Sequence, residues 1–591
     1  IENTEEQNKF LLSVRDALIK DKAPIRVVTP EGNIQGERPL EIFHKKDAKG
    51  AIVGNLPDYL PTGKTAEALV TRVDDELGLV YLRVAEAEAI LDISDMSWAR
   101  KPDPTIKADN APKLAKPSLA VKAGDVILVK VMNNQFGDGL TPERDKELHA
   151  KIAALKKANP KFTAPNFAAF AQVALEQEPI VEGSLIAFDL KTAETVAMVG
   201  GYDFKTSKFN RALQAKRQTG SIFKSIVYAA ALDKGFNPAT PVFDSPIVYE
   251  GEASTVEGQD TDIKKWKPHN HGEKFAGDVL FRSALVRSLN IPTVKILESV
   301  GVPWVIDYTR RWGVFSPLNA DLSLGLGSSS LTLYEMTRVF SQFGRMGKRL
   351  RPLLVHKVTD RDGNVLLTDL GLDAFFEKEL APIEQEYEQK RLAALEELKS
   401  KPEATPAAAD GKPEAAKANE KPKIYFADPE QVMTPQTAYV ITSLLQAVVS
   451  DDGGTAARAR SLGRPVAGKT GTTNGYIDGW FVGYTPGLAA GVWVGFNEEK
   501  TLGPGEVGGR TALPIWIEYM RSALGDSPGQ NFPVPSGIVF ANIDEQTGKL
   551  ASASSRSVVN QAFIQGTEPK EQSGAPSQQD DTDFYKQDLT E

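Results

Sequence analysis

Short apolar runs separated by turn-forming residues dominate the first part of the chain, after one amphipathic segment. Residues 3–20 place apolar side chains at helical spacing, which predicts an amphipathic helix within a linker-like segment, 1–23. From residue 24 to about 134, β-rich runs such as GLVYLRV and DVILVKVM alternate with turns. This pattern predicts a small all-β barrel or sandwich. Residues 135–181 are mixed and partly helical, and we expect them to be a connecting segment.

The pattern after residue 182 predicts a sheet with helices packed against it. SLIAFDLKTAETVAMVGG indicates a hairpin, and SIFKSIVYAAALDKG indicates a helix that ends near Gly235. A second apolar helix, AYVITSLLQAVV, precedes three strand-like runs: RPVAGKT, GWFVGYT and LAAGVWVGF. We therefore expect an α/β (α+β) domain built from two parts of the chain, 182–372 and 424–545.

A polar interruption separates these two parts. Residues 373–400 are rich in Glu, Lys, Leu and Ala, which predicts a charged, solvated helix. Residues 401–423 contain almost no large apolar side chain and cannot bury enough surface to become ordered, so we expect a disordered insertion. Residues 546–591 are predicted to be a C-terminal extension that ends in a disordered tail rich in Gln, Ser and Asp.

Composition narrows the class of protein. The chain has 591 residues, enough for two to four domains, and its 41% hydrophobic and 25% charged residues are typical of globular proteins. A formal net charge of −9 makes nucleic acid a poor partner. The absence of Cys excludes disulfides, thiolate zinc sites and Cys nucleophiles. No apolar run is long enough to span a membrane, and the chain begins with Ile1, so we expect that an N-terminal anchor has been removed.

The first candidate for chemistry is Ser221-Ile222-Phe223-Lys224, at the start of the predicted helix. The i, i+3 spacing places Ser221 and Lys224 on one helical face. A neutral lysine there could take the serine proton and activate the hydroxyl as a nucleophile. A serine before an apolar helix is more often an N-cap, so this motif alone is weak.

Two further short motifs follow along the chain. Ser288-Leu289-Asn290 is uninformative alone, because such triplets are common in loops. Lys469-Thr470-Gly471 lies on a predicted strand and would offer a cation and hydroxyls to an anionic substrate. Its glycine would let another backbone approach closely. Without context, an ordinary lysine-bearing edge strand explains this motif as well.

The order S-x-x-K, S-x-N, K-T-G is the signature of penicillin-binding proteins and serine β-lactamases. The flanking sequences, including GGYDFKTSKFNRALQAKRQTGSIFKS and ALVRSLNIPTV, resemble class A penicillin-binding proteins of the 1A type. The resemblance covers roughly residues 180–370 and 424–545. It implies a transpeptidase fold like that of serine β-lactamases, with a central antiparallel sheet flanked by helices. The β-rich segment would be the OB-like domain of this family.

The sequence departs from the family pattern at three points. Many relatives have proline on either side of the first motif, where this chain reads TGSIFKS. The second motif is S-L-N, not the S-D-N of β-lactamases, which favours a penicillin-binding protein. Nothing in the chain resembles the acidic glycosyltransferase motif of bifunctional relatives, so we expect no polymerisation of lipid II.

The resemblance implies roles for residues of the three motifs. Ser221 would attack the penultimate D-alanine carbonyl of a stem peptide and form an acyl-enzyme. Lys224 would accept its proton, Ser288 would pass a proton to the leaving D-alanine, Asn290 would bind the substrate amide, and Lys469 would set the local electrostatic field.

The same resemblance assigns substrate binding to Thr470, Gly471, Thr472 and Thr473, with Thr470 and Thr472 holding the terminal carboxylate. The backbone N–H groups of Ser221 and Thr472 would form the oxyanion hole. No cofactor or metal is implied. His269 and His271 form an H-x-H pair, but no third ligand is spaced for zinc, and we expect them to line a loop near the cleft together with Trp266, Pro268 and Asn270.

The implied function is D,D-transpeptidation of peptidoglycan at the periplasmic face of the bacterial cytoplasmic membrane. The expected partners are stem peptides, β-lactam antibiotics, the membrane through the missing anchor, and regulatory cell-wall proteins. A D,D-carboxypeptidase, a β-lactamase and a non-enzymatic β-lactam sensor or scaffold remain alternatives. The added β-rich domain and the insertion argue against a compact β-lactamase, and the intact motif residues argue against an inactive site.

Overall fold

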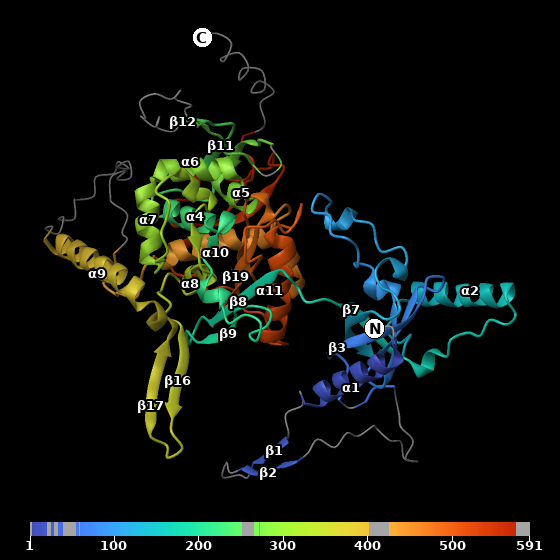
Figure 1. Ribbon diagram of the computed structural model, residues 1–591. Helices are drawn as coiled ribbons and strands as arrows, with labels where there is room; N and C mark the ends of the chain where they lie inside the picture. Colours follow the sequence, from blue (N-terminus) through green and yellow to red (C-terminus); the bar gives the residue numbers. More distant parts are fainter. Residues whose placement is uncertain are drawn as a thin grey trace, which may run out of the picture. The chain divides into compact units, whose positions relative to one another are not determined.

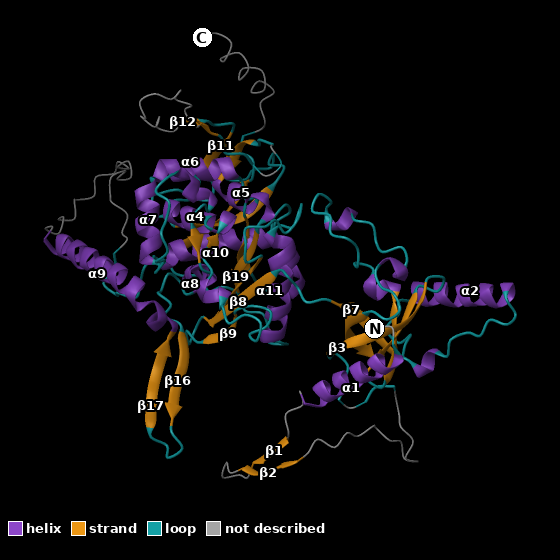
Figure 2. Cartoon of the chain, viewed as in Figure 1, coloured by secondary structure: helices purple, strands orange, loops and turns teal. Residues whose placement is uncertain are grey.

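The computed structural model describes residues 3–20, 25–28, 34–38, 55–57, 59–250, 265–270, 272, 274–400 and 425–574. The predicted insertion, 401–423, and the tail after residue 574 lie outside the described residues. The chain divides into two compact units, Ile1–Pro179 and Ile180–Glu591. Their helices and strands are shown in Figure 1 and Figure 2. Every helix in the described ranges is too short or too polar to be a membrane span.

The first unit is built around a closed five-stranded barrel in the order β3-β4-β5-β7-β6. Its strands are β3 (Thr65–Asp74), β4 (Leu79–Val84), β5 (Ala87–Asp92), β6 (Val126–Asn133) and β7 (Ala171–Glu176). The predicted N-terminal helix is α1 (Thr4–Lys20), and it buries Val14 and Leu18 in the core of the barrel. β1 (Ile25–Val28) and β2 (Ile34–Arg38) pair with each other and form a separate two-stranded sheet.

The barrel includes β7, which lies in the segment that the sequence indicated as a connection. β7 pairs in parallel with β5 and antiparallel with β6, so it closes the barrel. Helix α2 (Pro142–Ala158) buries Leu148 and Ile152 in a cluster with Leu79 and Ile90 of the strands. Residues 135–181 are therefore not a mere connection. The strand pattern missed them because a helix separates β7 from the other strands.

The second unit contains an antiparallel sheet in the order β18-β19-β20-β8-β9. The strands are β8 (Glu182–Asp189), β9 (Thr195–Val199), β18 (Ala467–Thr472), β19 (Asp478–Tyr484) and β20 (Leu488–Gly495). The predicted hairpin is β8–β9, and the three strand-like runs near the end of the chain are β18–β20. Segments about 300 positions apart in sequence thus pair side by side, as Glu182 does with Gly495, 313 positions later.

Helices cover both faces of this sheet, which confirms the predicted α+β fold. Along β8, Ile186 and Phe188 join the core formed with α4 (Lys224–Leu232), α8 (Leu333–Gly344) and α10 (Pro435–Ser450). The alternate residues Leu185 and Ala187 join a second cluster with α11 (Gly508–Leu524). Because successive strand residues point to opposite faces, the sheet is buried on both sides. Further helices of this unit are α3 (Arg211–Gln214), α5 (Phe281–Val286), α6 (Asn290–Val300) and α7 (Val302–Arg311).

The charged segment forms helix α9 (Glu377–Ser400), and one of its faces is packed against the domain. Leu380 and Tyr387 are only 3% and 4% exposed. The Arg349 guanidinium lies 5.0 Å from the centre of the Tyr387 ring. Arg391 donates to the carbonyls of Phe426 and Ala427, both at 3.0 Å. The expectation of a solvated helix is therefore wrong for this face.

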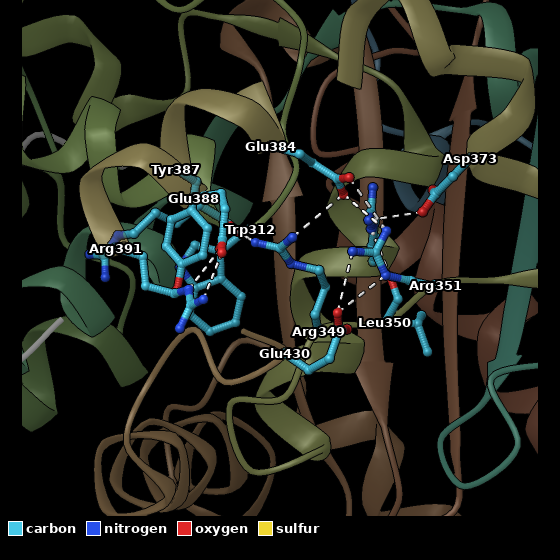
Figure 3. Close-up of polar contacts among 12 residues, drawn as sticks. Trp312, Arg349, Leu350, Arg351, Asp373, Glu384, Tyr387, Glu388, Arg391 and Glu430 are labelled. Carbon is cyan, nitrogen blue, oxygen red and sulfur yellow. Dashed lines mark hydrogen bonds and ion pairs between the residues drawn. The ribbon is translucent and has the colours of Figure 1, made fainter. Parts of the chain in front are cut away.

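Ion pairs add to this contact, as Figure 3 shows. Glu384 of α9 lies 3.5 Å from Arg349 and 3.1 Å from Arg351. Arg351 also lies 3.3 Å from Glu430. Arg351 precedes a hairpin of β16 (Leu353–Thr359) and β17 (Val365–Gly371), which extends from the domain in Figure 1.

The predicted C-terminal extension begins earlier than residue 546. β21 (Ile538–Asp544) pairs antiparallel with β22 (Val558–Ile564) along its whole length. Phe563 and Ile543 form a small buried cluster with Ala239 and Leu280, which lie beside α4 and α5. The two strands form one unit, so the boundary between domain and extension lies before β21.

Candidate active site

Ser221 lies in a 3₁₀ turn, Gly220–Ile222, and Lys224 begins helix α4 directly after it. The N-cap positions of these two elements are Thr219 and Phe223, and neither makes a side-chain cap. Ser221 is therefore not an N-cap, which was the main alternative for the first motif. The side chain of Ser221 is partly exposed, whereas Lys224 is fully buried.

The turn that carries Ser221 lies against strand β18. A Cβ on Gly220, whose φ is +52°, would lie 2.5 Å from the carbonyl oxygen of Thr472. A Cβ on Gly471 would lie 2.7 Å from Ile222 and 2.8 Å from the carbonyl oxygen of Thr219. Real side chains do not tolerate such distances, so the two glycines permit this close approach. The prediction for the glycine of the third motif is confirmed.

Lys224 reaches the second motif. Its Nζ donates to Asn290 Oδ1 at 2.6 Å, to the carbonyl of Ser288 at 2.7 Å and to that of Leu289 at 3.1 Å. Ser288 Oγ lies at 3.4 Å from the same nitrogen. These contacts fix the amine between the Ser221 turn and the junction of α5 and α6.

Ser288 joins the two lysines. It occupies the junction between α5 and α6 with φ of +57°, a conformation that is costly for a residue with a Cβ. Lys469 Nζ donates to Ser288 Oγ at 3.0 Å and to the Thr470 carbonyl at 3.1 Å. The Ser288 hydroxyl therefore lies between two buried amines and can pass a proton from one side to the other.

Burial weakens the proton affinity of both lysines. It lowers the pKa of Lys224 well below 10.5, and the positive charge of Lys469 lowers it further. Burial alone lowers the pKa of Lys469 to about 7. The three oxygens around Lys224 Nζ match the three N–H groups of a charged amine; a neutral Lys224 keeps two of these contacts and has a lone pair that can accept a proton. Lys224 is thus suited to act as a general base at a pH below the usual pKa of lysine.

The remaining residues of the third motif have different surroundings. Thr470 Oγ1 donates to Thr455 Oγ1 at 2.8 Å. Thr472 Oγ1 accepts from the Gly508 N–H at 3.0 Å, at the first residue of α11. The Asp478 N–H donates to Thr473 Oγ1 at 2.9 Å. Thr473 therefore stabilises the turn between β18 and β19.

The sequence did not predict the contacts that hold the site together, although it placed the loop of His269 and Asn270 near the cleft. Asp478 anchors the turn after Thr473 through Arg217 at 2.7 Å and Trp493 at 2.9 Å. Asn290 is held by the segment around His269 and Asn270. None of these contacts has a local sequence signal, because each joins residues far apart in the chain.

His269, the described member of the H-x-H pair, lies next to this site and contacts it through its backbone. His269 is exposed, and its carbonyl accepts from Asn290 Nδ2 at 2.6 Å. His271 is outside the described residues. In the described part of the chain, no three His, Cys, Asp or Glu side chains gather as metal ligands. A cavity of about 500 Å³ between α7 and α9 contains none of the predicted site residues.

Comparisons with known proteins cover almost the whole chain. The penicillin-binding protein transpeptidase domain matches residues 183–512, which is more than half of the chain. The penicillin-binding protein OB-like domain matches residues 30–181, a range that includes β7. The C-terminal domain of penicillin-binding protein 1A matches residues 534–575 and includes the β21–β22 pair.

Individual relatives agree with these matches. Penicillin-binding protein 1A of Pseudomonas aeruginosa is 32% identical over 551 residues, which are 92% of this chain and 59% of that protein. The protein of the same name from Neisseria gonorrhoeae is 34% identical over 372 residues, 62% of this chain and 39% of that protein. The chain thus spans less than two thirds of either relative.

A solved structure shows the same fold. Penicillin-binding protein 1A from Haemophilus influenzae superposes with a TM-score of 0.60 at 23% identity, covering 97% of this chain and 72% of that chain. Together with the family matches, this result establishes that the chain belongs to the penicillin-binding proteins, with the transpeptidase, OB-like and C-terminal domains of the 1A type.

Proposed function

We propose that this chain is a D,D-transpeptidase that cross-links peptidoglycan stem peptides through an acyl-enzyme on Ser221. One observation carries the proposal: buried Lys224, one turn from Ser221, shares the Ser288 hydroxyl with buried Lys469. A serine beside a neutral amine, with a second hydroxyl as relay, is the arrangement that acyl transfer needs.

The first half-reaction makes the acyl-enzyme. Neutral Lys224 takes the proton of the Ser221 hydroxyl as Oγ attacks the carbonyl carbon of the penultimate D-alanine. The backbone N–H groups of Ser221 and Thr472 stabilise the resulting oxyanion. The bond to the terminal D-alanine then breaks, and Ser288 delivers the proton to the leaving amine.

The second half-reaction resolves the ester. The amine of a neighbouring stem peptide attacks the acyl carbon, loses its proton to the same relay and restores the Ser221 hydroxyl. Asn290 binds the substrate amide, and Thr470, Gly471, Thr472 and Thr473 form the strand on which the substrate lies. A β-lactam acylates Ser221 in the same way, but its leaving group stays tethered and blocks the second step.

The proposed location is the periplasmic face of the bacterial cytoplasmic membrane, because stem peptides are found there. Its proposed ligands are stem peptides and β-lactams. Its further proposed partners are regulatory cell-wall proteins and the membrane, through an anchor. The resemblance to class A proteins supports this assignment.

The test is a product assay with a pentapeptide donor and a stem-peptide amine acceptor, analysed by mass spectrometry. A transpeptidase forms the cross-linked dimer and releases one D-alanine for each new bond. Free tetrapeptide without dimer would indicate a carboxypeptidase. A stable penicillin adduct without either product would indicate a sensor, and rapid release of hydrolysed penicillin a β-lactamase. Ser221→Ala is the negative control.

A further inference from the structure

The segment that contains His269 and Asn270 holds Asn290 at two points. Asn270 Oδ1 accepts from the backbone N–H of Asn290 at 2.9 Å and from that of Ile291 at 3.3 Å. The His269 carbonyl accepts from Asn290 Nδ2 at 2.6 Å. Both contacts come from residues more than a dozen positions earlier, on the other side of α5.

The first contact replaces a missing helix cap. Helix α6 begins at Asn290, and its own N-cap residue, Leu289, makes no side-chain hydrogen bond to the first turn. The first N–H groups of a helix have no partner within the helix. Asn270 supplies the acceptor from a distant part of the chain, so it determines where the first turn of α6 lies.

The second contact orients the amide of Asn290. With Nδ2 donating to the His269 carbonyl, Oδ1 is left to face Lys224 Nζ at 2.6 Å. If the amide were reversed, an N–H would point at the lysine. An amide nitrogen has two N–H bonds, and His269 is the one acceptor of Nδ2 among the described residues. The second N–H is therefore left for a substrate amide.

Asn270 is itself held by a buried carboxylate. Its Nδ2 donates to the two oxygens of Asp244 at 2.8 and 2.9 Å and to the Lys274 carbonyl at 3.0 Å. Asp244 Oδ2 also accepts from the Ala276 N–H at 2.9 Å. Asp244 and Asn270 are 1% and 5% exposed. A carboxylate can only accept here, so it fixes the amide of Asn270 with Oδ1 toward α6.

We propose that Asn270 is a positioning residue of this active site: held by Asp244, it fixes the first turn of α6 and thereby directs Asn290 Oδ1 toward Lys224. The inference rests on the proposed function, because its effect is expressed through acylation of Ser221. Asn270 does not touch the reacting groups and acts only through Asn290.

The exchange of the two polar side chains tests this role. Asn270→Asp places a carboxylate against Asp244 and removes the donor, so the acceptor for α6 loses its orientation. Adding Asp244→Asn restores one donor and one carboxylate with their places reversed. In the double variant, the carboxylate at position 270 accepts from the N–H groups of α6. The amide at position 244 donates to that carboxylate.

The measurement is the rate constant and the final yield of acylation by fluorescent penicillin, with the melting temperature of each variant. Asn270→Asp should slow acylation about 100-fold, as expected for a misplaced catalytic group, yet still reach a full yield of adduct. The double variant should recover at least about tenfold of this loss. Asn364→Asp is the matched control, because exposed Asn364 donates to Asp360 in the same manner, at 2.9 Å, in the β16–β17 hairpin. It should acylate like the wild type.

Three outcomes would overturn the proposal. One is an Asn270→Asp variant that acylates within about threefold of the wild type. Another is a variant that loses yield while its remaining fraction reacts at the wild-type rate, since that indicates a purely structural role. The third is a double variant that recovers nothing. If the wild type itself forms no adduct on Ser221, the proposed function fails, which is a separate result.

Discussion

Lys224 and Lys469 are two buried cations that contact the same serine hydroxyl. Such a pair is unfavourable while both are charged, because neither is solvated and each repels the other. Loss of one proton removes the repulsion between the two positive charges. Burial and the charge of Lys469 therefore lower the pKa of Lys224, so that its neutral state becomes accessible below the usual pKa of lysine.

This state predicts the pH dependence of acylation. Because the pKa of Lys224 lies well below 10.5, the neutral fraction grows as pH rises through the lowered value. The rate constant of penicillin acylation should rise with pH, with a midpoint far below that of free lysine. Lys224→Met and Lys224→Arg should both lower the rate by about 10²–10⁴, since neither side chain can accept the proton. An Arg variant with a near-normal rate would show that Lys224 acts as a charge.

Stability gives an independent measurement of the same shift. The unfolded chain binds a proton on Lys224 up to about pH 10.5, and the folded chain releases it earlier. The free energy of unfolding should therefore rise with pH between the lowered pKa and 10.5, by at most about 1.4 kcal/mol per pH unit for this group. The rise should be smaller in Lys224→Met. An equal rise in both proteins would contradict the assignment.

The motif residues that meet at the site could be predicted from the sequence. The residues that hold them in position could not. Ser221, Lys224, Ser288, Asn290 and Lys469 stand in three recognisable motifs, and the fold brings the motifs together. Asp244 and Asn270 belong to no motif, since a carboxylate and an amide acquire their role only when a loop returns to α6. Thr473 was predicted to bind substrate, a role that stays a prediction, and its hydroxyl hydrogen-bonds to Asp478.

At the scale of elements, α9 is more than a solvated insertion. Tyr387 is buried against Arg349, whereas Leu392 on the same helix is 49% exposed. Tyr387→Ala should lower the free energy of unfolding by about 3 kcal/mol, through lost burial and a cavity. Leu392→Ala is the matched control and should change it by less than about 0.5 kcal/mol. Chemical denaturation measures both values.

If the two variants had the same stability, α9 would be solvated, as its composition indicated. Penicillin acylation should be unchanged in both, because neither residue touches the site. The charged composition of α9 did not indicate its packing against the domain, because only a few apolar side chains on one face make that contact. Leu380 and Tyr387 lie on one helical face, and this spacing was the available signal.

The barrel contains one strand, β7, that the sequence pattern did not predict. Short β-rich runs punctuated by turn residues indicated β3 to β6. β7 is separated from them by α2, and its parallel pairing with β5 cannot be inferred from a local pattern. The central sheet was easier, because both its hairpin and its last three strands are strongly apolar.

At the scale of the whole molecule, the predicted chemistry belongs to one of the two units. All residues of the three motifs lie in Ile180–Glu591, and so do Asp244 and Asn270. A chain of residues 180–591 should fold and acylate with penicillin at close to the rate of the full chain. The rate constant is the measurement, with circular dichroism as a control for folding. A folded but unreactive second unit would show that the barrel unit is needed for the chemistry.

Ser221 is the proposed nucleophile. After incubation with penicillin, intact-mass measurement and peptide mapping show whether this residue carries the adduct. We expect one added penicilloyl group on the wild type, located on the peptide that contains Ser221. Ser221→Ala should carry none while it keeps the melting temperature of the wild type. An adduct of equal yield in Ser221→Ala, or one that maps to another residue, would show that Ser221 is not the nucleophile.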